Sequence, residues 1–398
     1  MTGVRRRRRA ERRERRRAAR RAIVVGAASA VVAVGTVTGL VSVAGGADSG
    51  QRTARTEASS APATTPLPAR PSPSPSPSPS SNPSAAPGVS PSVTRSSAPK
   101  RTAVPSPAPA PGGGVLYRHP DSQVIDWVRA HGGDPRRALI ESRIAAQPAA
   151  VWFAAYDPGE ITREVRAVTA GAAASGRVPV LVPYAIPDRD CGGASQGGAP
   201  DLGAYDRWIG EFADGLGAEP VIVVLEPDSL ALSDCLSGAA RAARNTALAR
   251  AGRTLKTANP RAKVYFDAGH SGWHSPSVMA GLLRAAGAAS SGDGIFTNVS
   301  NFHRTADETR YARAVLEALG GPARLGAVID TSRNGNGAPE AGAWCDPGGR
   351  ALGRAPTTRT GESRIDAFLW IKLPGESDGC RGTAGSFTPD YAYDLATG

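Results

Sequence analysis

Two carboxylates, Glu226 and Asp228, flank a proline directly after the apolar β-branched run 221–225. A carboxyl group held against an apolar wall ionises less readily, so its pKa rises and it can act as a general acid near neutral pH. Asp228 is therefore a candidate proton donor. Because Asp followed by Ser also commonly begins a helix, an N-cap is an equally good interpretation of this stretch taken alone.

Other polar residues also follow apolar runs, and carboxylates are common among them. The segments concerned are 184–191, 267–273, 298–301 and 372–378. Trp152, Trp273 and Trp344 lie just inside or beyond the ends of such runs. Flat aromatic faces pack against the C–H faces of sugar rings, and glycoside hydrolysis needs one protonated and one ionised carboxyl group. These residue types together indicate a glycosidase.

The elements that must position these residues are seven apolar runs with amphipathic segments between them. The runs are 150–156, 178–186, 220–226, 263–267, 295–299, 325–330 and 366–372, and the clearest amphipathic segments are 160–174, 238–258 and 305–319. Alternating β and α units predict an α/β fold with a parallel sheet, closed or nearly closed into a barrel. A doubly wound open sheet is the alternative, but no G-x-G-x-x-G follows an early strand. Trp127, Trp208 and Trp370 fall on helical or mid-strand positions, so we expect them in the core.

The first quarter of the chain differs in composition from the rest. Residues 1–21 hold twelve Arg and two Glu, and residues 22–47 carry no charge. This pattern predicts a cytoplasmic Arg-rich segment followed by a signal peptide or a transmembrane anchor, which would place the rest outside the cell. Residues 48–111, rich in Pro, Ser and Thr, predict a disordered linker. Residues 112–398 predict one catalytic domain.

Charge and cysteine content exclude several classes of function. The net charge of +12 belongs to the N-terminal arm, and residues 112–398 carry about −2, so nucleic acid is not an expected partner. The four cysteines form no C-x-x-C, and His270 and His274 lie outside any H-E-x-x-H, so no metal is expected. In an exported protein two disulfides are more probable than zinc; three pairings are possible, and the sequential one closes the shortest loops.

Seven blocks, in order, resemble glycoside hydrolase family 6, the cellulases. The two signature blocks are Tyr184-x-x-Pro187-x-Arg189-Asp190-Cys191 and Val224-Leu225-Glu226-Pro227-Asp228-Ser229-Leu230; the later ones are Asp267-Ala-Gly-His270-Ser-Gly-Trp273, Asn298-Val-Ser-Asn301, the segment 329–337, Trp344-Cys345 and Lys372-Leu-Pro-Gly-Glu376-Ser-Asp378-Gly-Cys380. The resemblance covers about residues 113–398. It implies a distorted seven-stranded β/α barrel that hydrolyses β-1,4-glucan with inversion.

The resemblance also implies roles for individual residues. Asp228 matches the general acid, Asp190 the carboxylate that raises its pKa and relays a proton, and Asp378 the proposed base. Asp267 matches a carboxylate that supports the acid, and Tyr184 the residue that distorts the sugar ring. The implied substrate-binding residues are Trp152, His270, Trp273, Asn301, Trp344, Lys372 and Glu376. The implied disulfides are Cys191–Cys235 and Cys345–Cys380. The family has a Ser that orients water a few residues after the Arg189-Asp190-Cys191 block. The resemblance implies no residue for this role here, because Ser195 does not align with that position without a shift of one residue.

Loop lengths favour an endo-acting enzyme. Exo-acting members of the family enclose the cleft with long loops, whereas only 34 residues separate Cys345 from Cys380. We expect a monomer without a cofactor that cleaves soluble or amorphous glucan, since no separate cellulose-binding module is visible. Two alternatives are a non-catalytic glucan-binding or wall-associated protein on the same fold, and a hydrolase of another β-glucan.

Overall fold

The computed structural model describes residues 114–340 and 343–398. The N-terminal segments 1–21, 22–47 and 48–111 of the sequence analysis lie outside the described residues. Among the described residues, no helix is long and apolar enough to cross a membrane.

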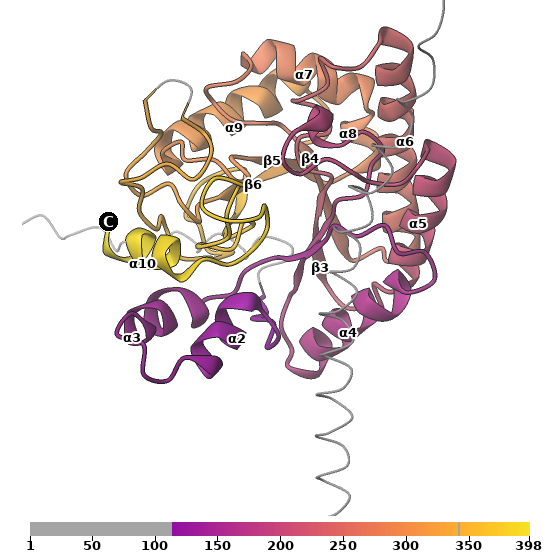
Figure 1. Cartoon of the computed structure of the whole chain (residues 1–398). Helices are drawn as coiled ribbons and strands as arrows, with labels where there is room; N and C mark the ends of the chain where they lie inside the picture. Colours follow the sequence, from indigo (N-terminus) through magenta and orange to yellow (C-terminus); the bar gives the residue numbers. More distant parts are fainter. Residues whose placement is uncertain (1–113, 341–342) are drawn as a thin grey trace, which may run out of the picture. The chain divides into compact units, whose positions relative to one another are not determined.

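Seven parallel strands form one curled sheet in the order of the chain (Figure 1). They are β1 (Val151–Phe153), β2 (Val180–Pro183), β3 (Val221–Leu225), β4 (Ala262–Asp267), β5 (Gly294–Thr297), β6 (Gly326–Asp330) and β7 (Ile365–Leu369). Each lies largely within one of the seven predicted runs, so the predicted α/β architecture is confirmed. All the strands except β4 are shorter than the predicted runs, because pairing stops before the polar loops begin.

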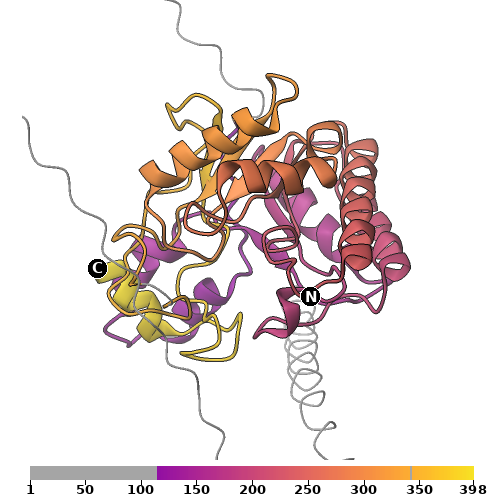
Figure 2. The ribbon, with the colours of Figure 1, turned by 90° about the horizontal axis from the view of Figure 1, so that it is seen from above.

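Helices connect the successive strands from β1 to β6 and cover the outside of the sheet, whereas no helix lies between β6 and β7 among the described residues. They are α4 (Ile161–Ala174), α5 (Leu202–Asp214), α6 (Gly238–Ala258), α7 (Pro276–Ala285), α8 (Ala288–Ser291) and α9 (Thr305–Leu319). Seen from above, these magenta to orange helices form a curved outer layer (Figure 2). Three of them begin at side-chain caps, in which Asp201, Ser237 and Ser275 accept a backbone N–H from the first turn.

A second group of helices brings the two ends of the described chain together. The helices α2 (Gln123–Ala130) and α3 (Arg137–Ile140), with the π-turn Glu141–Ala145 after α3, pack against α10 (Pro389–Thr397) (Figure 1). Arg136 also forms an ion pair with Asp390. Trp127 of α2 and Trp370, which follows β7, are buried in this cluster, and Trp208 is buried behind the sheet, as predicted.

The sheet does not close through a ladder between β1 and β7 within the described residues. A single backbone hydrogen bond joins the two sides, from the N–H of Ala150 to the carbonyl of Trp370 at 2.9 Å. Flanking segments complete the closure. Leu116 bridges to Val178 beside β2, and Thr357 bridges to Phe368 on β7. The hydroxyl of Thr358 then donates to the carbonyl of Gly114 at 3.1 Å. The barrel is therefore distorted, as expected.

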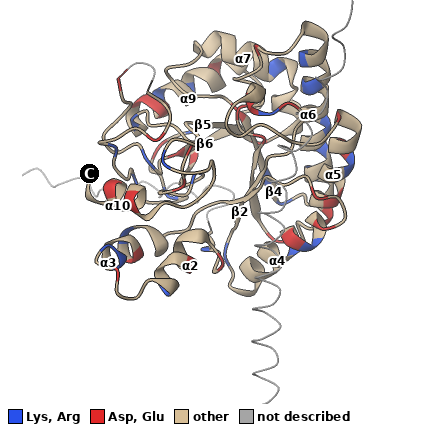
Figure 3. Cartoon of the chain, viewed as in Figure 1, with Lys and Arg blue, Asp and Glu red and all other residues tan. Residues whose placement is uncertain are grey.

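Charged residues lie on most of the outer helices: α4, α5 and α9 carry both signs, α6 and α7 carry only basic residues, and α10 carries only acidic ones (Figure 3). Residues 112–398 together carry a charge of about −2. A second set of acidic residues lies near the strand ends inside the ring of helices (Figure 3).

Candidate active site

A groove of about 870 Å³ lies at the carboxyl ends of the strands. All the predicted site residues except Asp267 line it: Trp152, Tyr184, Asp190, Asp228, His270, Trp273, Asn301, Trp344, Lys372, Glu376 and Asp378. The carboxyl ends of parallel strands meet at one edge, which explains how residues up to 226 positions apart in the sequence lie in one groove.

Asp228 lies just beyond β3 in a left-handed backbone conformation, with φ of 67°. Its side chain reaches the groove, and none of the described residues donates a hydrogen bond to it. Burial raises the pKa of Asp228 to about 8, and the negative charges of Asp267, Asp190 and Asp378 add to the effect. Asp228 is therefore protonated at neutral pH, as a general acid must be.

Asp267, at the end of β4, supports Asp228 from below the groove. Its buried carboxylate accepts backbone N–H groups from Leu230 at 3.0 Å, Ala231 at 2.8 Å and Gly269 at 2.9 Å. These bonds fix the chain that follows Asp228. Asp267 thus lies outside the groove lining, where it orients the backbone after Asp228 and contributes charge.

Asp190 lies in the loop after β2, next to Tyr184. Its Oδ2 accepts the N–H of Ser195 at 2.6 Å, and a Cβ on Gly193 would lie 2.6 Å from the same oxygen, so only glycine fits there. Tyr184 is buried, and its ring meets that of Trp152 edge to face, with centroids 5.3 Å apart. The guanidinium of Arg189 covers the Tyr184 ring at 4.5 Å.

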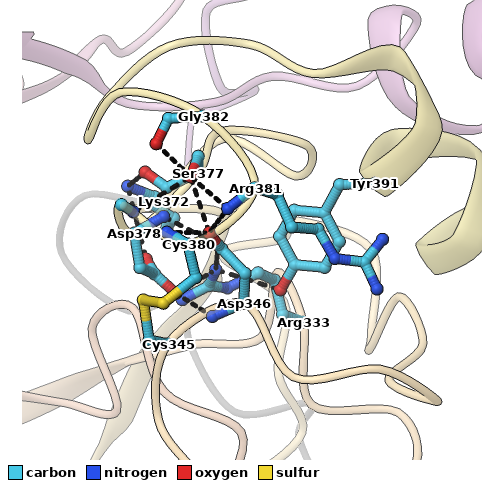
Figure 4. Close-up of a disulfide and its surroundings, with 11 residues drawn as sticks. Arg333, Cys345, Asp346, Lys372, Ser377, Asp378, Cys380, Arg381, Gly382 and Tyr391 are labelled. Atoms are coloured by element: carbon cyan, nitrogen blue, oxygen red, sulfur yellow. Dashed lines mark hydrogen bonds and ion pairs between the residues drawn. A yellow bond between two sulfur atoms is a disulfide. The ribbon is translucent and has the colours of Figure 1, made fainter.

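Asp378 lies across the groove in a network of charged groups (Figure 4). Arg333, which is fully buried after β6, donates from Nη1 to Oδ2 at 2.8 Å and from Nη2 to Oδ1 at 3.2 Å. The ammonium of Lys372 lies 3.6 Å from Oδ1. Two cations, Arg333 and Lys372, thus lie beside this one carboxylate, in the same groove as the protonated Asp228.

Aromatic and polar side chains line the rest of the groove. Trp344 exposes 59% of its surface, and Trp273 packs against His270 with centroids 5.4 Å apart. Burial, with His303 and His274 nearby, lowers the pKa of His270 to about 3, so its ring is neutral and can bind hydroxyl groups. Burial raises the pKa of Glu376 to about 7 despite Lys372, whose ammonium lies 3.9 Å away.

Two further carboxylates at strand ends repeat the arrangement of Asp267. Glu226 accepts the N–H groups of Ala185 and Ile186 at 3.0 Å, and Asp330 accepts those of Ile371 at 3.3 Å and Lys372 at 3.0 Å. Each ties the end of its strand to the loop of a neighbouring strand. The sequence alone assigns no role to Glu226, and Asp330 lies unremarked within the segment 329–337. A carboxylate that ends an apolar run was the available signal.

The disulfides Cys191–Cys235 and Cys345–Cys380 are present, with Cα atoms 5.8 Å apart in each pair. The first joins the loop that carries Asp190 to the segment after Asp228. The second joins the segment after Trp344 to the loop that carries Asp378. Among the described residues, no group of three or more His, Cys, Asp or Glu is arranged to hold a metal ion.

The sequence profile of the glycosyl hydrolases family 6 matches residues 116–396. Endoglucanase 1 of Streptomyces sp. (strain KSM-9) is 56% identical over 71% of this chain and 78% of its own length. Endoglucanase A of Thermobispora bispora is 50% identical over 74% of this chain and 65% of its own length. Among solved structures, the endoglucanase Cel6 of Mycobacterium tuberculosis, in complex with methyl-cellobiosyl-4-deoxy-4-thio-β-D-cellobioside, is 41% identical with a TM-score of 0.67; the match covers 73% of this chain and 99% of that one.

Proposed function

The chain belongs to the glycosyl hydrolases family 6, and from this premise we propose that it is an extracellular endo-β-1,4-glucanase that acts with inversion of configuration. The observation that carries the proposal is the meeting of Asp228, Asp190 and Asp378 in one groove, where burial and neighbouring negative charges raise the pKa of Asp228 to about 8. Glycoside hydrolysis with inversion requires this combination of a protonated acid and a carboxylate that activates water.

In the proposed mechanism Asp228 donates its proton to the departing glycosidic oxygen. A water molecule on the opposite face of the sugar attacks the anomeric carbon. Its proton passes to Asp378, or through further water to Asp190. Arg333 donates to both oxygens of Asp378, whereas among the described residues the Asp190 carboxylate accepts one backbone N–H, that of Ser195. Tyr184 distorts the sugar ring between them, and Asp267 holds the backbone after Asp228.

The remaining groove residues bind the glucan. Trp152, Trp273 and Trp344 supply aromatic faces for sugar rings. His270, Asn301, Lys372 and Glu376 supply hydrogen bonds to hydroxyl groups. Charged and aromatic residues lie side by side in the groove lining, which suits a polysaccharide with hydroxyl groups and apolar ring faces. Endoglucanase relatives and short disulfide-bonded segments support cleavage within chains.

Export from the cell is part of the proposal. Two disulfides are typical of an oxidising compartment, and the uncharged segment 22–47 after an Arg-rich segment 1–21 is typical of an export signal or anchor. We assign residues 48–111 to a linker and residues 112–398 to the catalytic domain. Fractionating cells and medium distinguishes a cleaved signal from a membrane anchor, and recovery in the cytosol would contradict export.

The test of catalysis is the release of reducing sugar from carboxymethylcellulose by the full chain and by Asp228→Ala. We expect release by the wild type that exceeds the variant by at least ~10²-fold, because general acid catalysis contributes about 10²–10⁴. Equal release would eliminate the catalytic function and leave a glucan-binding protein. NMR of fresh product tests inversion: the α anomer must form first, and an initial β anomer would contradict it.

A further inference from the structure

Asp346, directly after the disulfide residue Cys345, is a buried carboxylate that does not line the groove. Its backbone is left-handed, with φ of 45°, a conformation that costs energy for a residue other than glycine. Nothing in the proposed mechanism uses it. Hydrogen bonds to its carboxylate offset this cost.

The carboxylate of Asp346 collects donors from one short loop, residues 377–381 (Figure 4). Its Oδ1 accepts the N–H of Asp378 at 2.7 Å. Its Oδ2 accepts the hydroxyl of Ser377 at 2.6 Å and the N–H groups of Cys380 at 3.0 Å and Arg381 at 2.9 Å. Burial alone would raise the pKa of Asp346, but these bonds outweigh it and hold that pKa below its usual value.

A return contact links Asp346 to the groove side of the same loop. The N–H of Asp346 lies 3.3 Å from Oδ2 of Asp378, the oxygen that Arg333 also binds. The guanidinium of Arg333 lies 3.9 Å from Oδ1 of Asp346. Asp346 therefore holds Asp378 through the backbone N–H and through the side chain.

We propose that Asp346 is a positioning residue, which fixes the loop 377–381 so that the carboxylate of Asp378 keeps its orientation in the groove. The inference rests on the proposed function and adds a residue that acts through Asp378 without touching the substrate. The disulfide Cys345–Cys380 holds one point of the loop. Because Asp378 precedes Cys380 by two residues with Gly379 between them, the cross-link alone leaves its orientation free.

Asparagine is the most informative substitution for Asp346. Both oxygens of Asp346 face N–H donors, so in Asp346→Asn the amide nitrogen must oppose at least one of them. The better orientation keeps the oxygen toward Ser377, Cys380 and Arg381, which points the NH₂ group at the N–H of Asp378. The variant thus releases Asp378 with almost no change in volume.

The experiment measures kcat, KM and the pH profile on carboxymethylcellulose for the full chain. In Asp346→Asn we expect kcat to fall about 10- to 100-fold, the cost of a misplaced catalytic group, with KM within about twofold of the wild type. The basic limb of the pH profile should move to lower pH, because a displaced Asp378 no longer raises the pKa of Asp228. The matched control is Asp206→Asn on α5, which removes an Asp–Arg pair remote from the groove and should leave kcat unchanged.

The inference would be overturned if circular dichroism shows that Asp346→Asn is folded and its kcat and pH profile equal those of the wild type. If this variant does not fold, Ser377→Ala tests the inference instead, because it removes one hydrogen bond to Asp346. A lowered kcat at unchanged KM would support the inference. A wild-type kcat would overturn it. If the wild type is active and Asp228→Ala is not, the proposed function holds whatever the result for Asp346→Asn. Inactivity of both would overturn the proposed function and this inference with it.

Discussion

Arg333 and Asp378 form a pair of hydrogen bonds, at 2.8 and 3.2 Å, in which the side chain of the arginine has no exposed surface. The guanidinium also lies 4.5 Å from the ring of Phe302 and donates to the carbonyl of Ser300. Removing the arginine from this buried pair leaves Asp378 with Lys372, 3.6 Å away, as its remaining cation, which costs far more than losing a pair at the surface.

Replacement of Arg333 by Met should therefore lower the free energy of unfolding by about 3–5 kcal/mol. Urea unfolding of the full chain measures this difference. The control is Arg310→Met, since Arg310 pairs with Asp307 on the exposed face of α9 and its loss should cost less than about 1 kcal/mol. Equal losses in the two variants would show that the Arg333–Asp378 pair is no more important than a surface pair.

The activity should decline as the pH rises through about 8, where Asp228 loses its proton. Asp190→Asn removes one of the negative charges that raise the pKa of Asp228, so its basic limb should lie at lower pH although its overall activity is reduced. Profiles of kcat/KM against pH for both proteins give the comparison. A basic limb at the same pH in the two proteins would exclude charge repulsion between Asp190 and Asp228.

Asp228 should also make the fold less stable at neutral pH. Its pKa is raised on folding, so the folded state binds the proton more tightly, and stability falls as the pH rises from about 4 to about 8. Asp228→Asn removes this penalty. We expect its melting temperature at pH 7 to exceed that of the wild type by at least about 2–4 °C, the equivalent of about 1 kcal/mol. The difference should vanish near pH 4, and a difference independent of pH would contradict this explanation.

The disulfide Cys191–Cys235 spans 44 positions of the sequence. In the chain-entropy model a loop of this length contributes about 4 kcal/mol, so the double variant Cys191→Ser, Cys235→Ser should lose about that much stability. Thermal unfolding with and without a reducing agent measures the loss. If the reducing agent changes the melting temperature of the wild type and the double variant equally, the cross-link is not the cause.

The architecture followed from the sequence because each element has a strong local pattern. The predicted segments 160–174, 238–258 and 305–319 agree with α4, α6 and α9 to within one residue. The cluster of α2, α3 and α10 was not predicted, because its apolar faces become buried only when residues far apart in the chain meet.

The groove residues were predicted from the resemblance, since their blocks resemble a known pattern. The buried carboxylates that organise the groove were harder to find. Glu226, Asp330 and Asp346 bind backbone N–H groups, which every residue but proline possesses, so their partners leave no mark in the sequence. Arg333 lies within the matching segment 329–337, but its pairing with Asp378 across 45 positions depends on the curvature of the sheet.

The incomplete closure of the sheet between β1 and β7 affects how readily the protein aggregates at high concentration. An exposed strand edge has unpaired backbone N–H and C=O groups, so a strand of another molecule can pair with it and start an aggregate. Here the short segment around Leu116 covers the side of β2 next to β1, and Thr357 covers part of β7. The residues just before β2 and part of β7 are thus paired by the chain itself, which leaves fewer backbone groups free for another molecule to pair with.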